Sequence, residues 1–330
     1  KTFKDWPKER AKLYTFDTDK GEWHTREITI RIDNTPFARG NLRLCYYASL
    51  DENTDSDSDS GSSSVASGKA AGASPSLEEN PLKQEIVYVA KLSIDPFEER
   101  QTYFTDVQIQ MYSRLFAERF NAYDPPKKIE FLKAWLVELT DRKGSPMCGI
   151  ERFITGPYRK HNNNFGYVSD LERNTPQAFS HFTYVASEHR LLICDIQGVD
   201  DVYTDPQVHT SELPPPRGKK SFAEFLQGKG TMGQRGIDSF LSGHKCNAIC
   251  RYLRLPMEND KEIDDSDVMG TMPSQKFMAL QQVRAVDFKQ PTLPAAASGV
   301  GATSSTTLLD KGIRTGTNND DSCCSCCTIM

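Results

Sequence analysis

The stretch DIQGVDDVYTDPQ, residues 195 to 207, places acidic and amide side chains where a buried strand ends. Residues 191 to 194 are all apolar, which predicts that strand. Asp195 ends it and Gln197 follows two positions later; in extended chain two such residues point to the same face. A carboxylate and an amide oxygen aimed at one place suit a hard cation such as Mg²⁺. The alternative is that the aspartates and glycine here only form turns.

The composition limits the class of protein. The chain has 330 residues, of which 37% are hydrophobic, enough for a large core in two lobes. Its net charge of -5 argues against a general nucleic-acid binder. No apolar run approaches the roughly 20 residues that span a bilayer, and no apolar signal segment is present. The nine cysteines are therefore expected to be reduced thiols, metal ligands or modification sites rather than a disulfide framework, as in a cytoplasmic protein.

Low-complexity segments divide the chain. Residues 51 to 81 are acidic and rich in Ser, Gly and Ala, with almost nothing to bury, which predicts a disordered insertion. We interpret residues 1 to 19 as a lead-in, 20 to 255 as one folded domain and 256 to 330 as a flexible tail. Within the domain, apolar spacing predicts a mixture of strands and helices. Strands are expected at 27–33, 42–50, 85–94, 128–139 and 148–154, and helices at 104–121, 175–187 and 233–253.

Potential metal ligands gather in HKCNAIC near the end of the domain. Cys246 and Cys250 are four residues apart and so share a face of the predicted helix, with His244 at its edge. One imidazole and two thiolates lack one ligand for a closed tetrahedral zinc site, and His181 is the candidate for the fourth. The alternative is that the cysteines are ordinary buried thiols and His244 is a surface residue.

A glycine-rich segment, GKGTMGQRG, precedes that helix and contains Gly228, Gly230, Gly233 and Gly236. It matches G-x-G-x-x-G, but it does not follow the first strand of a βαβ unit, so it is not a dinucleotide-binding fingerprint. It also follows the acidic stretch, whereas the glycine loop of conventional protein kinases precedes their catalytic residues.

The order of these motifs resembles the alpha-kinase family of atypical Ser/Thr protein kinases. The resemblance runs through PFARGNLRLCYY, YVAK, YFTDVQIQM, KHNNNFGYV, TPQAFSHFTY, DIQGVDDVYTDPQVHT, GKGTMGQRG and HKCNAIC, and covers most of residues 20 to 255. Within this family, the elongation-factor-2 kinases are the members to which the chain is compared. The resemblance implies a two-lobed α+β kinase-like fold with ATP between the lobes and a structural zinc site in the C-lobe.

The resemblance also implies roles for individual residues. Near the nucleotide it places Lys91 on the ATP phosphates, Arg43 nearby, the Glu151 side chain and the Ile154 backbone at the adenine, and the glycines 228, 230, 233 and 236 close to the cleft. Asp195 and Gln197 hold Mg²⁺, and Asp205 engages the substrate hydroxyl. His181, His244, Cys246 and Cys250 bind structural zinc.

These roles fit phosphoryl transfer, in which catalysis is mainly positioning and charge neutralisation. The expected activity is transfer of the ATP γ-phosphate to a protein serine or threonine, with a translation elongation factor as one candidate substrate. Thr231, where the family usually has asparagine, and a longer segment before Gly228 leave the substrate open. Whether calmodulin controls the protein is also undecided, because only KTFKDWPKERAKLY precedes the domain. The alternatives are a nucleotide-binding scaffold with weak or no catalysis, and a zinc-dependent hydrolase, whose usual motifs are absent.

The last residues, DDSCCSCCTIM, end in a C-a-a-X pattern. Cys327 is the expected farnesylation site. Because one lipid chain gives only marginal membrane binding, Cys323, Cys324 and Cys326 are expected to add palmitoyl groups. This predicts a protein tethered to the cytoplasmic face of a membrane. The alternative is a cysteine-rich tail that binds metal opportunistically or has no role.

Overall fold

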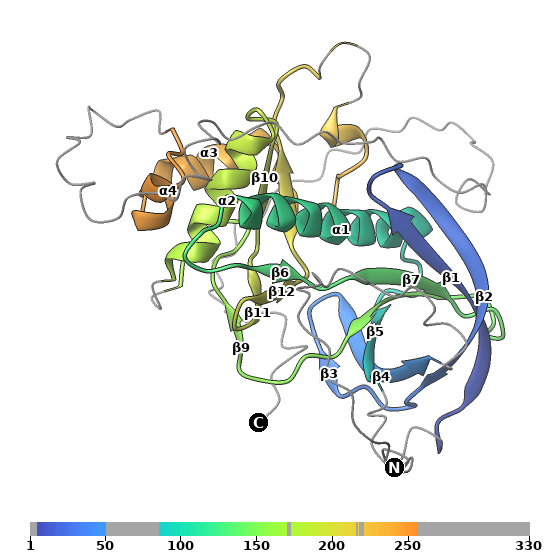
Figure 1. The fold of residues 1–330 in the computed structure, drawn as a ribbon. Helices are drawn as coiled ribbons and strands as arrows, with labels where there is room; N and C mark the ends of the chain where they lie inside the picture. Colours follow the sequence, from blue (N-terminus) through green and yellow to red (C-terminus); the bar gives the residue numbers. More distant parts are fainter. Residues whose placement is uncertain (1–4, 51–85, 170–172, 216, 218–220, 257–330) are drawn as a thin grey trace, which may run out of the picture.

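The computed structural model describes residues 5–50, 86–169, 173–215, 217 and 221–256 (Figure 1). The predicted insertion at 51–81 and the lipidation cysteines 323, 324, 326 and 327 lie outside these residues. Within the described part of the chain, no helix is both long and apolar enough to cross a membrane.

The N-lobe is a seven-stranded antiparallel sheet in the order β2-β1-β7-β8-β5-β4-β3. β2 also pairs with β4, through Ile30 and Leu50 among others, so the sheet closes on itself. Alternation along β2 explains its inner face, since Ile28, Ile30 and Ile32 are buried between more exposed neighbours. The strands are β1 (Lys8–Asp17), β2 (Glu22–Ile32), β3 (Ala38–Arg39), β4 (Arg43–Leu50), β5 (Tyr88–Ser93), β7 (Ala134–Glu138) and β8 (Met147–Arg152).

The C-lobe combines two small sheets with short helices. One sheet has the order β6-β12-β11-β9 and the other pairs β10 with β13. Its strands are β6 (Glu130–Phe131), β9 (Tyr158–Lys160), β10 (Leu191–Cys194), β11 (Gln197–Val199), β12 (Val202–Thr204) and β13 (Gln207–Thr210). Its helices are α2 (Asn174–Ala186), the 3-10 turn η3 (Phe222–Glu224), α3 (Gln234–Gly243) and α4 (Ala248–Tyr252). The predicted α+β class is confirmed.

The long helix α1 (Arg100–Ala122) runs across the molecule between the two lobes (Figure 1). Toward the N-lobe, Phe104 packs edge-on against Tyr14 of β1 at 5.4 Å between ring centroids. Toward the C-lobe, Phe120 packs against Phe179 and Phe182 of α2, at 5.7 and 5.4 Å. All these rings belong to one buried core cluster, so the lobes share a core through α1.

Three segments differ from the sequence prediction. β1 lies in the predicted lead-in, yet it pairs with both β2 and β7. Residues 128–139 form two strands, β6 and β7, in different sheets. The single helix predicted at 233–253 is wrong, because the chain leaves helical geometry between α3 and α4. Asn247 causes the break: its side chain accepts hydrogen bonds from the Ile249 and Cys250 backbone and caps α4.

Candidate functional site

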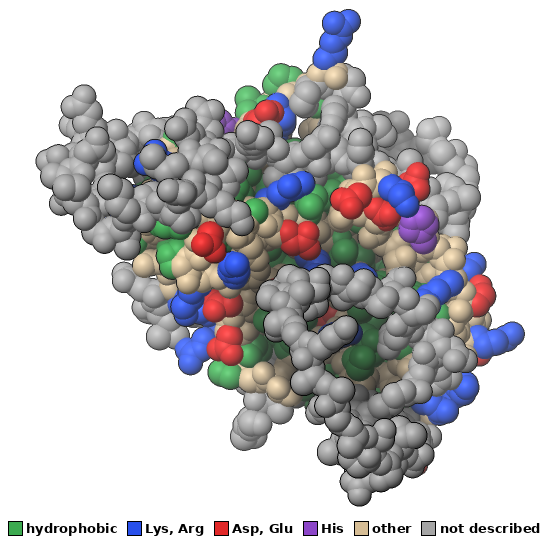
Figure 2. Space-filling model, viewed as in Figure 1, with side chains coloured by type: hydrophobic (Ala, Val, Ile, Leu, Met, Phe, Trp, Pro, Cys, Tyr) green, Lys and Arg blue, Asp and Glu red, His purple; other side chains and the backbone are tan. Residues whose placement is uncertain are grey.

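A cleft of about 830 Å³ is lined by residues of both lobes. Charged side chains of both signs face it, and each basic group lies beside an acidic one. On the face of the molecule in Figure 2, basic and acidic side chains are likewise intermingled over the described surface. The charged residues that line the cleft are Arg43, Lys91, Asp106, Glu151, Lys160, Asp195, Asp205 and Lys229.

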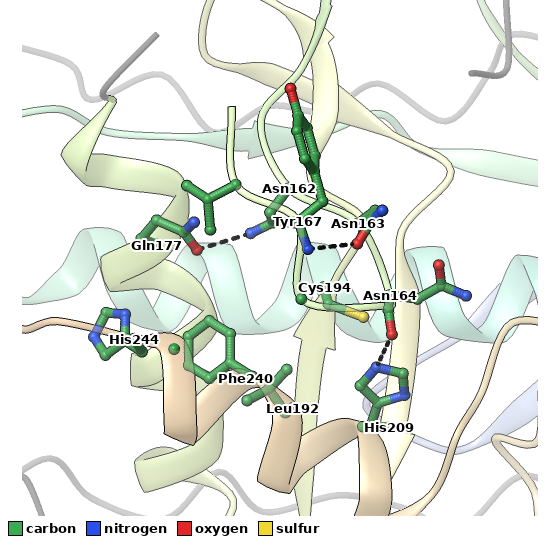
Figure 3. Close-up of a pocket in the computed structure, with 14 residues that line it drawn as sticks. Asn162, Asn163, Asn164, Tyr167, Gln177, Leu192, Cys194, His209, Phe240 and His244 are labelled. Atoms are coloured by element: carbon green, nitrogen blue, oxygen red, sulfur yellow. Dashed lines mark hydrogen bonds between the residues drawn. The ribbon is translucent and has the colours of Figure 1, made fainter. Parts of the chain in front are cut away.

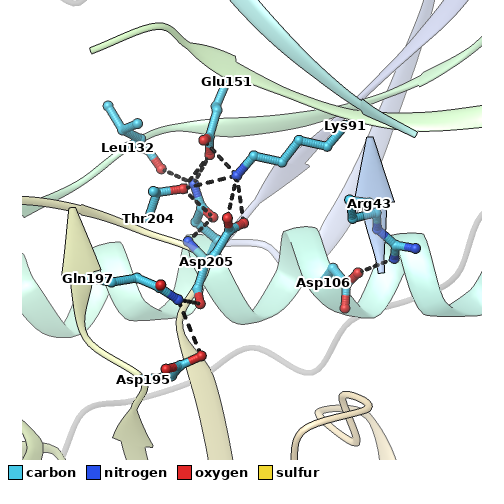
Figure 4. Close-up of polar contacts among 10 residues, drawn as sticks. Arg43, Lys91, Asp106, Leu132, Glu151, Asp195, Gln197, Thr204 and Asp205 are labelled. Carbon is cyan, nitrogen blue, oxygen red and sulfur yellow. Dashed lines mark hydrogen bonds and ion pairs between the residues drawn. The ribbon is translucent and has the colours of Figure 1, made fainter. Parts of the chain in front are cut away.

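Lys91 lines this cleft and contacts two of its carboxylates (Figure 4). It lies on β5 between Cys45 and Gly149 of the neighbouring strands, and its side chain is buried. The Nζ atom is 2.7 Å from Glu151 Oε1 and 2.6 Å from both carboxylate oxygens of Asp205. One ammonium therefore joins a carboxylate of the N-lobe sheet to one of the C-lobe.

Glu151 is fully engaged inside the protein. Its Oε2 atom accepts hydrogen bonds from Thr204 Oγ1 at 2.6 Å and Gln110 Nε2 at 2.9 Å, while Oε1 pairs with Lys91. The resemblance implied that this carboxylate faces adenine, with help from Ile154. That role stays a prediction. In the structure Glu151 lines the cleft and its oxygens contact Lys91, Thr204 and Gln110, whereas Ile154 is not among the lining residues.

Asp195 and Asp205 reach the cleft because the chain turns sharply at each of them. Both have left-handed backbone angles, with φ of 58° and 50°, directly after β10 and β12 end. Aspartate tolerates this conformation better than most residues. The sequence suggested that Asp195 and Gln197 share a face because the chain is extended between them. The turn at Asp195 shows that this reason is wrong.

Asp195 and Gln197 nevertheless meet. Gln197 Nε2 donates to Asp195 Oδ2 at 3.2 Å and to the Asp205 carbonyl at 3.3 Å. Its Oε1 is buried and has no hydrogen-bond partner among the described residues. Burial raises the pKa of Asp195, an effect that Lys160, 2.6 Å away, opposes. A carboxylate beside an orphaned amide oxygen fits a hard cation, which would satisfy that oxygen.

Arg43 and the glycine-rich segment meet at Glu98. Arg43 donates to Glu98 at 2.9 Å and to Asp106 at 2.7 Å, and Lys229 lies 2.8 Å from the same Glu98 oxygen. Burial favours a raised pKa for Glu98, but hydrogen bonds from Lys229 and Arg43 outweigh it and lower the pKa to about 2. Glu98 therefore carries charge throughout the physiological range and links the lobes.

Two glycines of the glycine-rich segment, Gly230 and Gly236, pack too closely against neighbouring side chains to leave room for a Cβ atom. A Cβ at Gly230 would lie 2.4 Å from Gln207 Oε1, and one at Gly236 would lie 2.4 Å from the His209 ring. Gly230 lines the cleft, whereas Gly228, Gly233 and Gly236 are not among its lining residues.

The four predicted zinc ligands converge away from the cleft. The ligand atoms of His181, His244, Cys246 and Cys250 all lie within 4.8 Å of one another. Cys246 Sγ is 3.7 Å from His181 Nδ1, and Cys250 Sγ is 3.6 Å from His244 Nε2. The reasoning that put both cysteines on one helix face is wrong, because Cys246 precedes α4. The loop before α4 brings them together instead.

His181 is oriented as a metal-binding histidine would be. Its Nε2 lies 3.1 Å from the Pro256 carbonyl, to which it can only donate. The proton is then on Nε2, which leaves the lone pair of Nδ1 facing the cysteines. Two imidazoles and two thiols in this arrangement fit a tetrahedral zinc ion.

A two-lobed α+β domain whose cleft holds a buried lysine, an ion-paired aspartate and an acid–amide pair has the parts of a nucleotide-dependent phosphotransferase. The model of the alpha-kinase family matches residues 38–250. The chain belongs to the alpha-kinase family, whose members are protein kinases.

Curated relatives agree with this assignment. Alpha-protein kinase 1 of Dictyostelium discoideum is 42% identical over 276 residues, which is 84% of this chain and 17% of the relative. Myosin heavy chain kinase B of the same organism is 42% identical over 268 residues, 80% of this chain and 31% of the relative. Human eukaryotic elongation factor 2 kinase is 37% identical over 248 residues, which is 75% of this chain and 30% of the relative. The chain thus spans less than a third of these relatives.

Solved structures show the same domain. The alpha-kinase domain of myosin heavy chain kinase A with ADP is 38% identical, with a TM-score of 0.58 over 76% of this chain and 99% of that one. An inactive variant of that domain with ATP is 38% identical, with a TM-score of 0.59, and the match covers 76% of this chain and 98% of that one.

Proposed function

We propose that the protein is an ATP- and Mg²⁺-dependent kinase that phosphorylates serine or threonine in other proteins. The observation that carries this proposal is the convergence of Lys91, Asp205 and the Asp195–Gln197 pair on one interlobe cleft. The catalytic unit extends from β1 to about residue 255, with the insertion inside it.

Each residue has a role in the transfer. Lys91, held by Glu151, binds the ATP phosphates as a fixed positive charge, and Arg43 adds a second one nearby. The hydroxyl oxygen of the acceptor attacks the γ-phosphorus, the bond to the β–γ bridging oxygen breaks and ADP leaves. The hydroxyl proton passes late in the step to a carboxylate oxygen of Asp205, which also orients the acceptor.

Asp195 and the Gln197 carbonyl are the residues that would hold Mg²⁺. When bound, the ion neutralises charge on the phosphates. Lys160 keeps Asp195 in place through its 2.6 Å contact.

Replacing Asp195 by asparagine should raise the Mg²⁺ concentration needed for half-maximal activity by roughly tenfold or more, because one anionic ligand is lost. Titrating activity against Mg²⁺ at saturating ATP measures this. Asp201→Asn is the matched control: its carboxylate pairs with Arg173 and does not line the cleft. An unchanged Mg²⁺ requirement in Asp195→Asn would contradict the assignment.

The activity itself is tested by incubating the protein with radiolabelled ATP and candidate substrates. Myosin heavy chain and elongation factor 2 are the first candidates, because relatives are named for them. Phosphoamino-acid analysis of the labelled protein identifies serine or threonine. Nucleotide binding without any labelled product would favour the scaffold alternative.

We further propose that His181, His244, Cys246 and Cys250 bind zinc as a structural ion. Four protein ligands leave no open position for water or substrate, so this site takes no part in the chemistry.

Membrane attachment through Cys327, with Cys323, Cys324 and Cys326, stays a prediction from the sequence. Cell fractionation of the wild type and Cys327→Ser tests it. We expect the wild type on membranes and the variant in solution; the same distribution for both would rule out farnesylation as the determinant.

A further inference from the structure

Large apolar side chains line the cleft and yet remain exposed. Phe165 and Tyr167, in the segment after β9, are 68% and 48% exposed, and Leu42 of the N-lobe is 52% exposed. All three belong to the lining of the cleft that contains Asp205. Large exposed apolar side chains that line one cleft indicate a surface that binds another molecule.

Hydrogen bonds with Asn163 hold the turn that carries the two rings; Figure 3 shows the one with Tyr167. Asn163 Oδ1 accepts hydrogen bonds from the backbone N–H groups of Phe165 and Tyr167, both at 2.8 Å. The Asn163 N–H donates in turn to the Tyr167 carbonyl at 3.1 Å. These bonds close a tight turn. Little further conformational entropy of the backbone is therefore lost when a ligand binds to the rings.

This turn is also tied to the glycine-rich segment. Asn164 Nδ2 donates to the Gly230 carbonyl at 2.8 Å. His209 Nε2 donates to the Asn164 carbonyl at 3.0 Å, while its Nδ1 accepts from the Met232 N–H at 3.0 Å. Burial lowers the pKa of His209, which keeps the ring in the neutral form that this double contact needs. The turn and the glycine-rich segment are thus joined by hydrogen bonds, and Asn164 and Gly230 form one continuous part of the cleft lining.

The position of this part of the lining indicates its occupant. Lys160, which holds Asp195, ends β9 only five residues before Phe165. The two rings line the same cleft as Asp195, Gln197 and Asp205. A protein kinase must admit a stretch of polypeptide there to bring its hydroxyl to Asp205, and the residues beside the acceptor would pass the rim.

We propose that Phe165 and Tyr167, with Leu42 on the opposite lobe, form an apolar rim that binds a hydrophobic side chain next to the phosphoacceptor of the protein substrate. This inference rests on the proposed kinase activity. It assigns these residues to substrate selection, with the sequence around the acceptor as the feature they recognise.

A peptide array tests the proposal. Each peptide carries one central threonine in a polar background, and one flanking position at a time is changed to Leu, Phe or Ser. The wild type should prefer the hydrophobic residue at one or more positions by roughly tenfold in kcat/KM. Phe165→Ser and Tyr167→Ser together should remove that preference. Leu213→Ser is the matched control, since Leu213 is 47% exposed but is not in the cleft lining.

The outcomes separate this inference from the proposed function. Labelled peptides with no hydrophobic preference, or a preference that survives in the double variant, would overturn the inference alone. A raised KM for ATP with unchanged peptide selectivity would also overturn it, because the rings would then contact the nucleotide. If the wild type labels the candidate proteins but no peptide, the inference alone fails. If it labels neither, the proposed kinase activity fails and the inference fails with it.

Discussion

Replacing Lys91 by methionine is expected to reduce phosphoryl transfer by at least about 10³-fold, because Lys91 supplies the fixed positive charge next to Asp205 in the cleft. The structure adds a second effect. Lys91→Met leaves the buried Glu151 carboxylate without its cation, which should cost about 3 kcal/mol of folding stability. A loss of roughly 10 °C in melting temperature follows.

A second substitution separates the two effects. Glu151→Gln in the Lys91→Met background removes the stranded charge, so the melting temperature should recover while activity stays lost. Asp205→Asn should lose activity with a smaller change in stability, because Asp205 is more exposed than Glu151. Lys128→Met, which removes an exposed ion pair with Asp124, is the control for both assays. Retention of near-normal turnover in Asp205→Asn or in Lys91→Met would show that the catalytic assignment is wrong.

Replacing Cys250 by serine should lower the melting temperature by roughly 10–20 °C, as expected if about 5 kcal/mol of metal-binding free energy is lost from folding. Cys246→Ser should do the same, because either change leaves three ligands. The protein should contain about one zinc per chain before the substitution and much less after it. Elemental analysis of purified protein, run beside thermal unfolding, measures both.

Cys148→Ala provides the matched control for the zinc cluster. Cys148 is a buried thiol on β8, so this variant loses some packing but should keep its metal. A wild-type protein that is folded and active without zinc would refute the structural role. Loss of activity in Cys250→Ser at full stability would instead point to a catalytic metal.

Much of the fold was predictable from local pattern. The strand at 191–194 and the helices near 104–121 and 175–187 carry clear periodicity, and the structure has β10, α1 and α2 there. The periodic pattern gave the wrong prediction where a single residue decides where a helix ends or begins. Asn247 caps a new helix inside residues 233–253, which were interpreted as one helix, and its side-chain hydrogen bonds mark the break. Likewise, β1 lies in a charged segment whose alternation is too weak to distinguish from a lead-in.

For the site, the sequence indicated which residues gather but not how they pair. Lys91 and Asp205 are 114 positions apart, and their contact depends on how the lobes meet. Gln110 and Lys160, which fix Glu151 and Asp195, were missed. A buried glutamine on a helix and a lysine ending a short strand have no pattern that separates them from ordinary residues. The available signals were the YFTDVQIQM motif, which contains Gln110, and the KHNNNFGYV motif, which begins with Lys160.

Helix α1 has a consequence for how the molecule moves and melts. Its aromatic rings pack against β1 on one side and α2 on the other, so the lobes share a buried core beside the cleft. A hinge motion that separated the whole lobes would expose those rings to water, which opposes such a motion and favours ligand entry through smaller movements at the mouth of the cleft. The same continuity makes the two lobes one cooperative unit. A destabilising substitution in one lobe should therefore lower the stability of both.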